Sequence, residues 1–282
     1  MAIEAIPSGD GVGADIRGVD LRAPLASAAA AAIREAWHRH LVLRIRGPVL
    51  SDAQLIAFSR NFGDLDKSAI SEVGTYADVA PEVTVVSNII VDGKPIGSLG
   101  AGEASWHTDS SCEPAPPDGS VLHALEIPPA GGNTQFCSMY EAYDRLPPDL
   151  AARIAGRKAV HDNSYTAAGS LRKGKKEVTD VRQTAGAHHP LVRTHPVTGR
   201  KALYLGRRRN AWIVGMPVAE SEELLDRLWA HATTGVSVWT QEWQVGDIVM
   251  WDNRVVMHRR DPFDPATRRL LHRTQIKGTV PY

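Results

Sequence analysis

The sequence has little cysteine, no excess of charge of either sign and no long apolar run. Its 282 residues contain only Cys112 and Cys137, which excludes a disulfide framework, and their spacing does not match a zinc site. Lys+Arg and Asp+Glu both number 32, so no basic surplus indicates nucleic acid as a partner. Because no run reaches about 18 apolar residues, we expect neither a membrane span nor a membrane partner.

The first residues also lack the pattern of a secretory signal. Positions 1–7 read Met-Ala-Ile-Glu-Ala-Ile-Pro, without a basic segment followed by an apolar one. A chain with so few cysteines is typical of a reducing compartment. We therefore expect a cytoplasmic protein.

The distribution of apolar residues favours a mainly β fold with flanking helices. Apolar residues make up 43% of the chain, which is ample for a buried core. Helices are expected at 26–39, 52–62 and 218–232 and within 139–156. Strands are expected at 41–46, 83–90, 121–127, 134–137, 189–195, 201–205, 247–251 and 269–276. Since neither an internal repeat nor a βαβ alternation appears, we predict a double-stranded β-helix (jelly roll) in a single domain spanning 1–282.

Two segments between the expected elements are rich in Gly, Pro or basic residues. Positions 94–102 should form a loop just before the motif described next. Positions 160–186 have little periodicity and are interpreted as a lid-like insertion over a site. The basic run at 172–176 is interpreted as a solvated loop, with an anion site as the alternative. The run at 207–209 is left unassigned, and a solvated turn is its simplest interpretation.

The tripeptide His107-Thr-Asp109 carries the strongest chemical signal. Residues two apart on an extended strand point to the same face, so this imidazole and this carboxylate can bind one metal ion together. A second histidine would complete the facial arrangement of non-haem Fe(II) oxygenases, which leaves the opposite positions open. His-x-Asp alone is common by chance. His258 is one of eleven histidines, so spacing does not select the third ligand.

Four segments, in order, resemble the taurine dioxygenase and phenoxyacetate-herbicide dioxygenase family of Fe(II)/2-oxoglutarate enzymes. The resemblance covers most of the chain. It implies that His107, Asp109 and His258 bind Fe(II), and that Thr134 and Arg269 hold the distal carboxylate of the cosubstrate 2-oxoglutarate. The matching segments are Trp106-His-Thr-Asp109, Pro128-Pro-Ala-Gly-Gly-Asn-Thr134, Trp251-Asp-Asn-Arg254 with His258, and Arg268-Arg-Leu-Leu-His-Arg273.

The residue types fit the implied cosubstrate site. A planar guanidinium matches a carboxylate with two parallel hydrogen bonds and stays charged when buried, and a Thr hydroxyl adds one donor. The competing interpretation of Arg269 is a surface strand residue or a structural ion pair.

The resemblance also implies that Arg273 binds the acidic group of the prime substrate, the compound that is oxidised. Positions four apart on a strand face the same side, so Arg269 and Arg273 can both point inward. Two departures from the family pattern concern taurine. No histidine lies between His40 and His107 to contact a sulfonate, and Glu103 replaces an amide that contacts the amine. A zwitterionic substrate that pairs with Glu103 and Arg273 is one expectation, and an exposed Glu103 is the other.

We therefore predict an Fe(II)- and 2-oxoglutarate-dependent dioxygenase that uses O2 to hydroxylate an aliphatic C–H of a small acidic substrate, releasing succinate and CO2. Two rivals remain: a non-catalytic jelly-roll sensor of 2-oxoglutarate, and a zinc hydrolase with the same three ligands. The hydrolase would not need the pairing of Thr134 with Arg269. Relatives implied by the resemblance often form homo-oligomers, but no interface is visible in the sequence.

Overall fold

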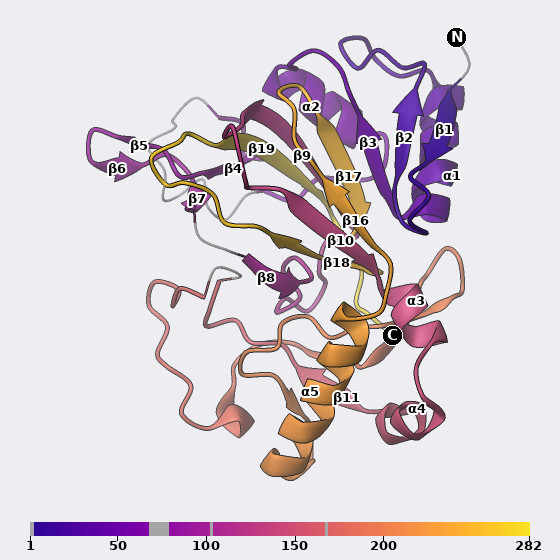
Figure 1. The fold of residues 1–282 in the computed structure, drawn as a ribbon, viewed down its shortest axis with the longest axis vertical. Coiled ribbons are helices and arrows are strands. Elements are labelled where there is room, and N and C mark those ends of the chain that lie inside the picture. The colour runs from indigo at the N-terminus through magenta and orange to yellow at the C-terminus, as the bar shows by residue number, and fades with distance from the viewer. Residues whose placement is uncertain (1–2, 68–78, 102–103, 167–168) are drawn as a thin grey trace.

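A computed structural model describes residues 3–67, 79–101, 104–166 and 169–282, and most of its regular structure is β (Figure 1). An eight-stranded sheet has the order β1 (Glu4–Pro7), β2 (Ala14–Arg17), β3 (Val42–Ile45), β17 (Ile248–Asp252), β9 (Gly119–Glu126), β19 (Leu270–Ile276), β4 (Thr84–Ser87) and β7 (Ser98–Leu99). A four-stranded antiparallel sheet has the order β16 (Val238–Gln241), β10 (Thr134–Ser138), β18 (Val256–Arg260) and β8 (Ala104–His107).

Helices and short strands surround these two sheets. The helices are α1 (Ser27–His40), α2 (Asp52–Ser59), α3 (Met139–Asp144), α4 (Pro148–Ile154) and α5 (Val218–Thr233), with a 3-10 turn at Val181–Gln183. A three-stranded sheet contains β12 (His188–Pro190), β11 (Lys158–Val160) and β15 (Trp212–Ile213). Two hairpins pair β13 (Val192–Thr194) with β14 (Lys201–Leu203), and β5 (Ile90–Val91) with β6 (Lys94–Pro95). In the described part of the chain, no helix is both long and apolar enough to cross a bilayer.

Strand β17 shows why the central strands are apolar on both faces. Val249 and Trp251 point into a core shared with Phe136 of the smaller sheet. The alternate residues Ile248 and Met250 pack on the other face, in a second core with α1 and α2. The continuous apolar run therefore follows from burial on two sides rather than from a helix.

Most elements lie where the sequence predicts them. Helices 26–39 and 218–232 are confirmed as α1 and α5. Helix α2 begins after Ser51, whose side chain accepts a hydrogen bond from the Gln54 amide, but it ends at Ser59 rather than at 62. The segment 94–102, predicted as a loop, contains β7 and part of the β5–β6 hairpin, and the N-terminal strands β1 and β2 were not predicted.

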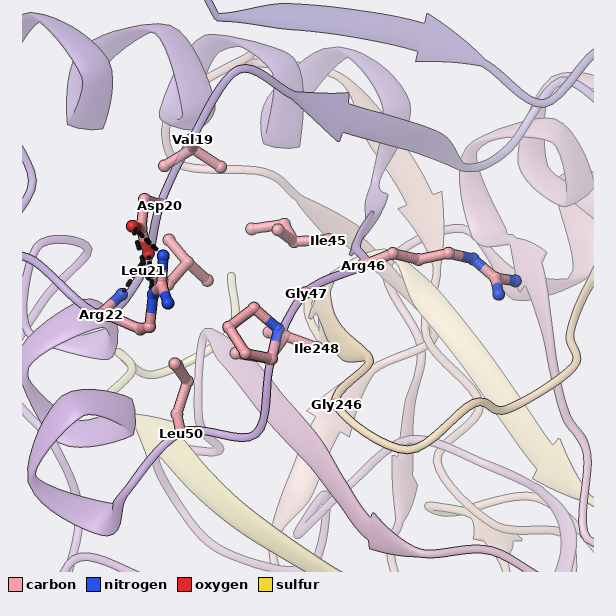
Figure 2. A pocket seen from close by; sticks show the side chains of 11 residues that line it. Val19, Asp20, Leu21, Arg22, Ile45, Arg46, Gly47, Leu50, Gly246 and Ile248 are labelled. Atoms are coloured by element: carbon pink, nitrogen blue, oxygen red, sulfur yellow. Dashed lines mark hydrogen bonds and ion pairs between the residues drawn. The ribbon is translucent and has the colours of Figure 1, made fainter.

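A pocket of about 200 Å³ lies between the β2–α1 segment and the ends of β3 and β17 (Figure 2). Its cation Arg22 already donates to both carboxylate oxygens of Asp20, through Nε and Nη2. Its apolar lining is contributed by side chains such as Ile45, Leu50 and Ile248. The second cation of the lining, Arg46, has its Nε 3.9 Å from Asp247 Oδ1, so both cations lie near a carboxylate.

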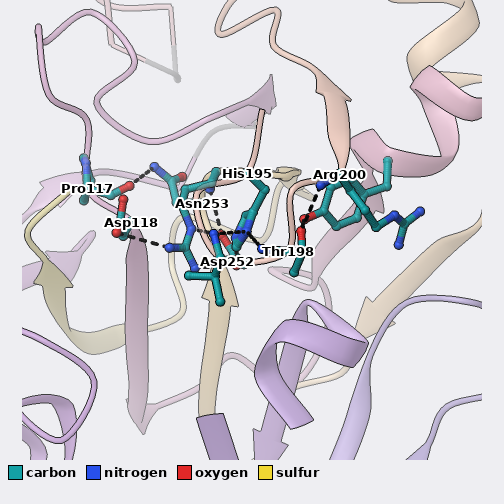
Figure 3. Close-up of polar contacts among 10 residues, drawn as sticks. Pro117, Asp118, His195, Thr198, Arg200, Asp252 and Asn253 are labelled. Carbon is teal, nitrogen blue, oxygen red and sulfur yellow. Dashed lines mark hydrogen bonds and ion pairs between the residues drawn. The ribbon is translucent and has the colours of Figure 1, made fainter. Parts of the chain in front are cut away.

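A buried ion pair closes the turn between β17 and β18. The Asp252 carboxylate, 0% exposed, accepts hydrogen bonds from Arg254 Nε and Nη2 at 2.8 and 2.7 Å and from His195 Nε2 at 3.0 Å. Arg254 Nη1 also donates to Asp118 Oδ2 at 3.2 Å (Figure 3). Burial would raise the pKa of Asp252, but Arg254 and His195 hold it well below its usual value.

Replacing Asp252 with Asn should reduce the free energy of unfolding by about 3–5 kcal/mol, since the buried Arg254 loses its main carboxylate. Urea denaturation followed by circular dichroism measures the change. Asp20→Asn is the matched control, because Asp20 and Arg22 form the same i,i+2 pair in solvent and should contribute almost nothing. Equal effects of the two substitutions would contradict a stabilising role for the Asp252 pair.

Candidate metal and cosubstrate site

Adjacent strands bring two histidines and one aspartate together. His107 of β8 and His258 of β18 are directly opposite in the antiparallel register, and their ring centroids are 4.2 Å apart. Asp109 lies two residues beyond the end of β8, and its Oδ1 is 3.5 Å from His107 Nε2 and 3.8 Å from His258 Nε2. All three side chains are buried, and their ligand atoms lie within 4.8 Å of one another. This separation fits three ligands on one side of a single metal ion.

The protonation of these groups also suits a metal. His107 Nδ1 is 2.8 Å from the Ser105 carbonyl, which can only accept, so Nδ1 carries the proton and Nε2 presents its lone pair. Burial, followed by the nearby His107, lowers the pKa of His258 to about 3, which keeps its imidazole neutral. Burial would raise the pKa of Asp109, but Arg273 and His107 hold it well below its usual value. Two neutral imidazoles and one carboxylate form the donor set of a non-haem Fe(II) site.

The two oxygens of Asp109 have different partners. Oδ1 faces the imidazoles, whereas Oδ2 accepts hydrogen bonds from Arg273 Nη1 at 2.9 Å and Ser120 Oγ at 3.1 Å. These two donors orient the carboxylate so that one oxygen is available to a metal. Arg273, predicted as a substrate contact, therefore lies at the site, and its Nε is buried without a partner in the described residues.

The main chain of Asp109 is held by Asn253. Its side-chain oxygen accepts from the Asp109 amide at 2.9 Å, and its Nδ2 donates to the Asp109 carbonyl at 3.0 Å. The same Nδ2 donates to the Pro117 carbonyl at 2.9 Å, beside the ion pair of Asp252 (Figure 3). Sequence reasoning noted Asn253 only as part of the segment 251–254 and gave it no role. Its position directly after a buried strand is the one signal that the sequence offered.

Arg269 is a buried cation that pairs with no carboxylate of the described residues. The side chain is 2% exposed, and in the described part of the chain its Nε has no hydrogen-bond partner. Its Nη2 makes only a long bond, 3.4 Å, to the Gly132 carbonyl. Burial, followed by the charge of Arg260, lowers its pKa to about 9. The geometry therefore does not match the competing interpretation of Arg269 as a surface residue or a structural ion pair.

Thr134 follows a glycine that packs against this guanidinium. Gly132 is two residues before it, and a Cβ at Gly132 would be 3.3 Å from Arg269 Nε. Thr134 Oγ1 accepts a hydrogen bond from Trp243 Nε1 at 3.0 Å, so its own proton remains available to a ligand. Arg269 and Thr134 together offer several hydrogen-bond donors and carry no negative charge, which suits the binding of a carboxylate.

The remaining sequence candidates have different outcomes. Glu103 lies outside the described residues. His195, another of the eleven histidines, is structural: its Nδ1 accepts from the amides of Val197 and Thr198, and its Nε2 bonds Asp252. His161 is buried with no hydrogen-bond partner at either ring nitrogen within the described ranges.

Comparisons with known proteins agree with this site. Residues 3–275 match the family described as "Taurine catabolism dioxygenase TauD, TfdA family". The chain is 37% identical over 287 residues to an alpha-ketoglutarate-dependent 2,4-dichlorophenoxyacetate dioxygenase of Cupriavidus pinatubonensis, covering 97% of each chain. It is 34% identical to an (S)-phenoxypropionate/alpha-ketoglutarate-dioxygenase of Delftia acidovorans, covering 98% of this chain and 95% of that one. The structure of AAD-2 with Mn(II) and N-oxalylglycine superposes with a TM-score of 0.79 at 33% identity, covering 100% and 99%.

Replacing Asn253 with Ala should weaken metal binding about 10- to 100-fold, because Asp109 loses both main-chain contacts that position it. Titration with Co(II), followed by absorbance, measures the affinity directly. Asn61→Ala is the control, since the Asn61 side chain also bonds two main-chain carbonyls, but at the end of α2. An unchanged Co(II) affinity in the Asn253 variant would show that Asp109 is positioned without it.

Proposed function

Because the chain belongs to the taurine catabolism dioxygenase TauD, TfdA family, we propose that it hydroxylates an aliphatic C–H bond of a small acidic substrate. It is a 2-oxoglutarate-dependent dioxygenase, and its cofactors are Fe(II) and 2-oxoglutarate. The observation that best supports the proposal is a buried His-Asp-His cluster in the same chain as a buried guanidinium, that of Arg269, for which the described residues offer no carboxylate partner. A hydrolytic zinc site would not need such a guanidinium.

His107, Asp109 and His258 would hold Fe(II) through two imidazole nitrogens and one carboxylate oxygen. Bound Fe(II) supplies the oxygen activation that couples decarboxylation of 2-oxoglutarate, to succinate and CO2, with hydroxylation of the substrate. Arg273 and Ser120 occupy Asp109 Oδ2, which favours binding through Oδ1 alone and leaves more positions open on the metal. Surrounding apolar residues such as Phe136 and Trp251, which pack against the His258 ring, exclude water.

Arg269 and Thr134 would bind the distal carboxylate of 2-oxoglutarate. A buried charge without a partner destabilises the folded protein, and a carboxylate ligand offsets that cost. The lone pairs of the carboxylate would accept hydrogen bonds from the guanidinium and from the Thr134 hydroxyl. This arrangement aims the oxo-acid end of the cosubstrate at the metal.

The acidic group of the prime substrate would contact Arg273, whose Nε is without a partner in the described residues. Two relatives are named for 2,4-dichlorophenoxyacetate and (S)-phenoxypropionate, both aryloxy acids. Aryloxyalkanoates are therefore a suitable starting class for this chain, and zwitterionic compounds test the predicted role of Glu103. Hydroxylation next to the ether oxygen would cleave such a substrate.

Further parts of the proposal concern architecture and location. Two sheets that share one core support a jelly-roll topology of the double-stranded β-helix type. We propose one domain, with residues 160–186 as a lid; their described part has one isolated bridge, Tyr165 with Leu171, and one short 3-10 turn. Both cysteines are free, which supports a reducing, cytoplasmic location. A homo-oligomer is proposed by the resemblance alone.

The Arg269→Gln variant should bind 2-oxoglutarate roughly 100-fold more weakly, since a charge-assisted pair with the distal carboxylate is lost. The charge-transfer absorbance of the anaerobic Fe(II)–2-oxoglutarate complex gives the dissociation constant. Arg268→Gln is the matched control, because the adjacent Arg268 forms an exposed ion pair with Glu126. If both variants bind the cosubstrate as the wild type does, the carboxylate is held elsewhere.

The enzyme should release succinate only when Fe(II), 2-oxoglutarate and O2 are all present, and faster with its prime substrate. A screen over aryloxy acids, sulfonates, amino acids and phosphonates, with ascorbate, measures succinate. A non-catalytic sensor would form the same anaerobic complex and yet release no succinate with any compound or without one. That result would overturn the proposed activity while leaving the binding site in place.

A further inference from the structure

A second cleft lies beside the metal centre, on strand β8. It has a volume of about 440 Å³, and its lining includes Ser105, Trp106, Asp162, Tyr165, Arg207 and Trp229. Ser105 is two residues before His107, and its carbonyl bonds the His107 ring. The cleft therefore reaches the strand that carries the first metal ligand.

Arg207 is fixed next to Asp109 by the backbone. The Gly206 carbonyl accepts a hydrogen bond from the Thr108 amide at 3.0 Å. Gly206 has a φ of +66°, and a Cβ there would lie 2.0 Å from His161 Nδ1, so a side chain does not fit at this position. This close approach determines where the next residue, Arg207, enters the cleft.

Two cations share one carbonyl in this cleft. Arg207 Nη1 and Arg172 Nε both donate to the Tyr165 carbonyl, at 3.0 and 3.3 Å. Arg207 Nε is buried without a partner, and neither guanidinium forms an ion pair with a carboxylate of the described residues. Asp162, the acidic residue in the lining, instead accepts from the Ser164 amide and Asn210 Nδ2.

The neighbouring Arg208, in contrast, has carboxylate partners. Arg208 Nη2 lies 2.6 Å from Glu222 and Arg208 also bonds Asp226 at 2.7 Å, both on α5. Burial is the main cause that lowers the pKa of Arg207, and the like charge of Arg172 adds to it. Arg207, in a run that the sequence alone left unassigned, is therefore held in the fold at an electrostatic cost.

We infer that Arg207, backed by Arg172, is a second anion-binding position at the mouth of the metal centre, and that the prime substrate is a dianion. One acidic group faces Arg273 and the other faces Arg207, with an apolar chain between them. The inference rests on the proposed function, which places the substrate at this metal centre. A carboxylate, sulfonate or phosphonate can each supply the outer group, since all accept the two-pronged hydrogen bonding of a guanidinium.

The test uses the full-length protein with Mn(II) and saturating N-oxalylglycine, which fill the metal and cosubstrate positions. Calorimetry measures the binding of glutarate, adipate, suberate and sebacate, each beside the monocarboxylate of equal chain length. At the chain length that spans the two arginines, the dicarboxylate should bind about tenfold more tightly than its monocarboxylate, as expected for one added charge-assisted contact. No preference at any length would overturn the inference.

Arg207→Gln should abolish this preference and leave monocarboxylate binding unchanged, whereas Arg208→Gln, the matched control, should keep it. Arg172→Gln, on the segment opposite, should reduce the preference and serves if the Arg207 variant does not fold. Equal behaviour of the position 207 and 208 variants, or an Arg172 variant identical to the wild type, would contradict the assignment.

The anaerobic Fe(II)–2-oxoglutarate absorbance separates the two proposals. Its absence in the wild type would contradict the proposed function. Its presence without a dicarboxylate preference would contradict only the second anion-binding position.

Discussion

The buried carboxylate of Asp109 is the interaction on which the site depends. It is the one acidic group of the cluster, and its two oxygens divide two tasks: Oδ1 faces both imidazoles, and Oδ2 is held by Arg273 and Ser120. If Oδ2 were free, the carboxylate would be able to rotate or bind a metal through both oxygens, which would occupy a position that O2 or the cosubstrate needs. Arg273 therefore orients the Asp109 carboxylate, in addition to the substrate contact proposed for it.

Desolvated arginines near the site differ in whether they have a carboxylate partner. Arg254 has two, the buried Asp252 and the half-buried Asp118, so it stabilises the fold and has no charge to offer. Arg269 and Arg207 are unpaired among the described residues: each is desolvated by the fold, has no carboxylate partner there, and keeps a buried Nε without a hydrogen-bond partner. An uncompensated buried charge destabilises the folded protein. Unpaired arginines of this kind therefore indicate positions where an anionic ligand supplies the negative charge.

Local patterns predicted the helices α1 and α5, the strand runs and the same-side placement of His107 and Asp109, because these depend on periodicities of a few residues. The family resemblance supplied His258, Thr134 and Arg269, which no periodicity connects. The roles that the sequence did not predict depend on contacts between distant segments. Asn253 bonds Asp109 across 144 positions, and the close packing of Gly206 on His161 directs Arg207. A run of three arginines looks uniform in sequence, and only tertiary packing separates the paired Arg208 from Arg207.

The connection from β17 to β18 shows how stability and chemistry share one short segment. Alternate residues point in opposite directions: Asp252 and Arg254 bond each other and fix the turn, while Asn253, between them, faces the main chain of Asp109. The chain then enters β18 and delivers His258 opposite His107. Because the ion pair sets the direction of the Asn253 side chain, a change that loosens it would also displace Asp109, which lies beyond the end of β8 and is proposed as a metal ligand. The ion pair between Asp252 and Arg254 therefore helps to hold Asn253, and through it Asp109, in position.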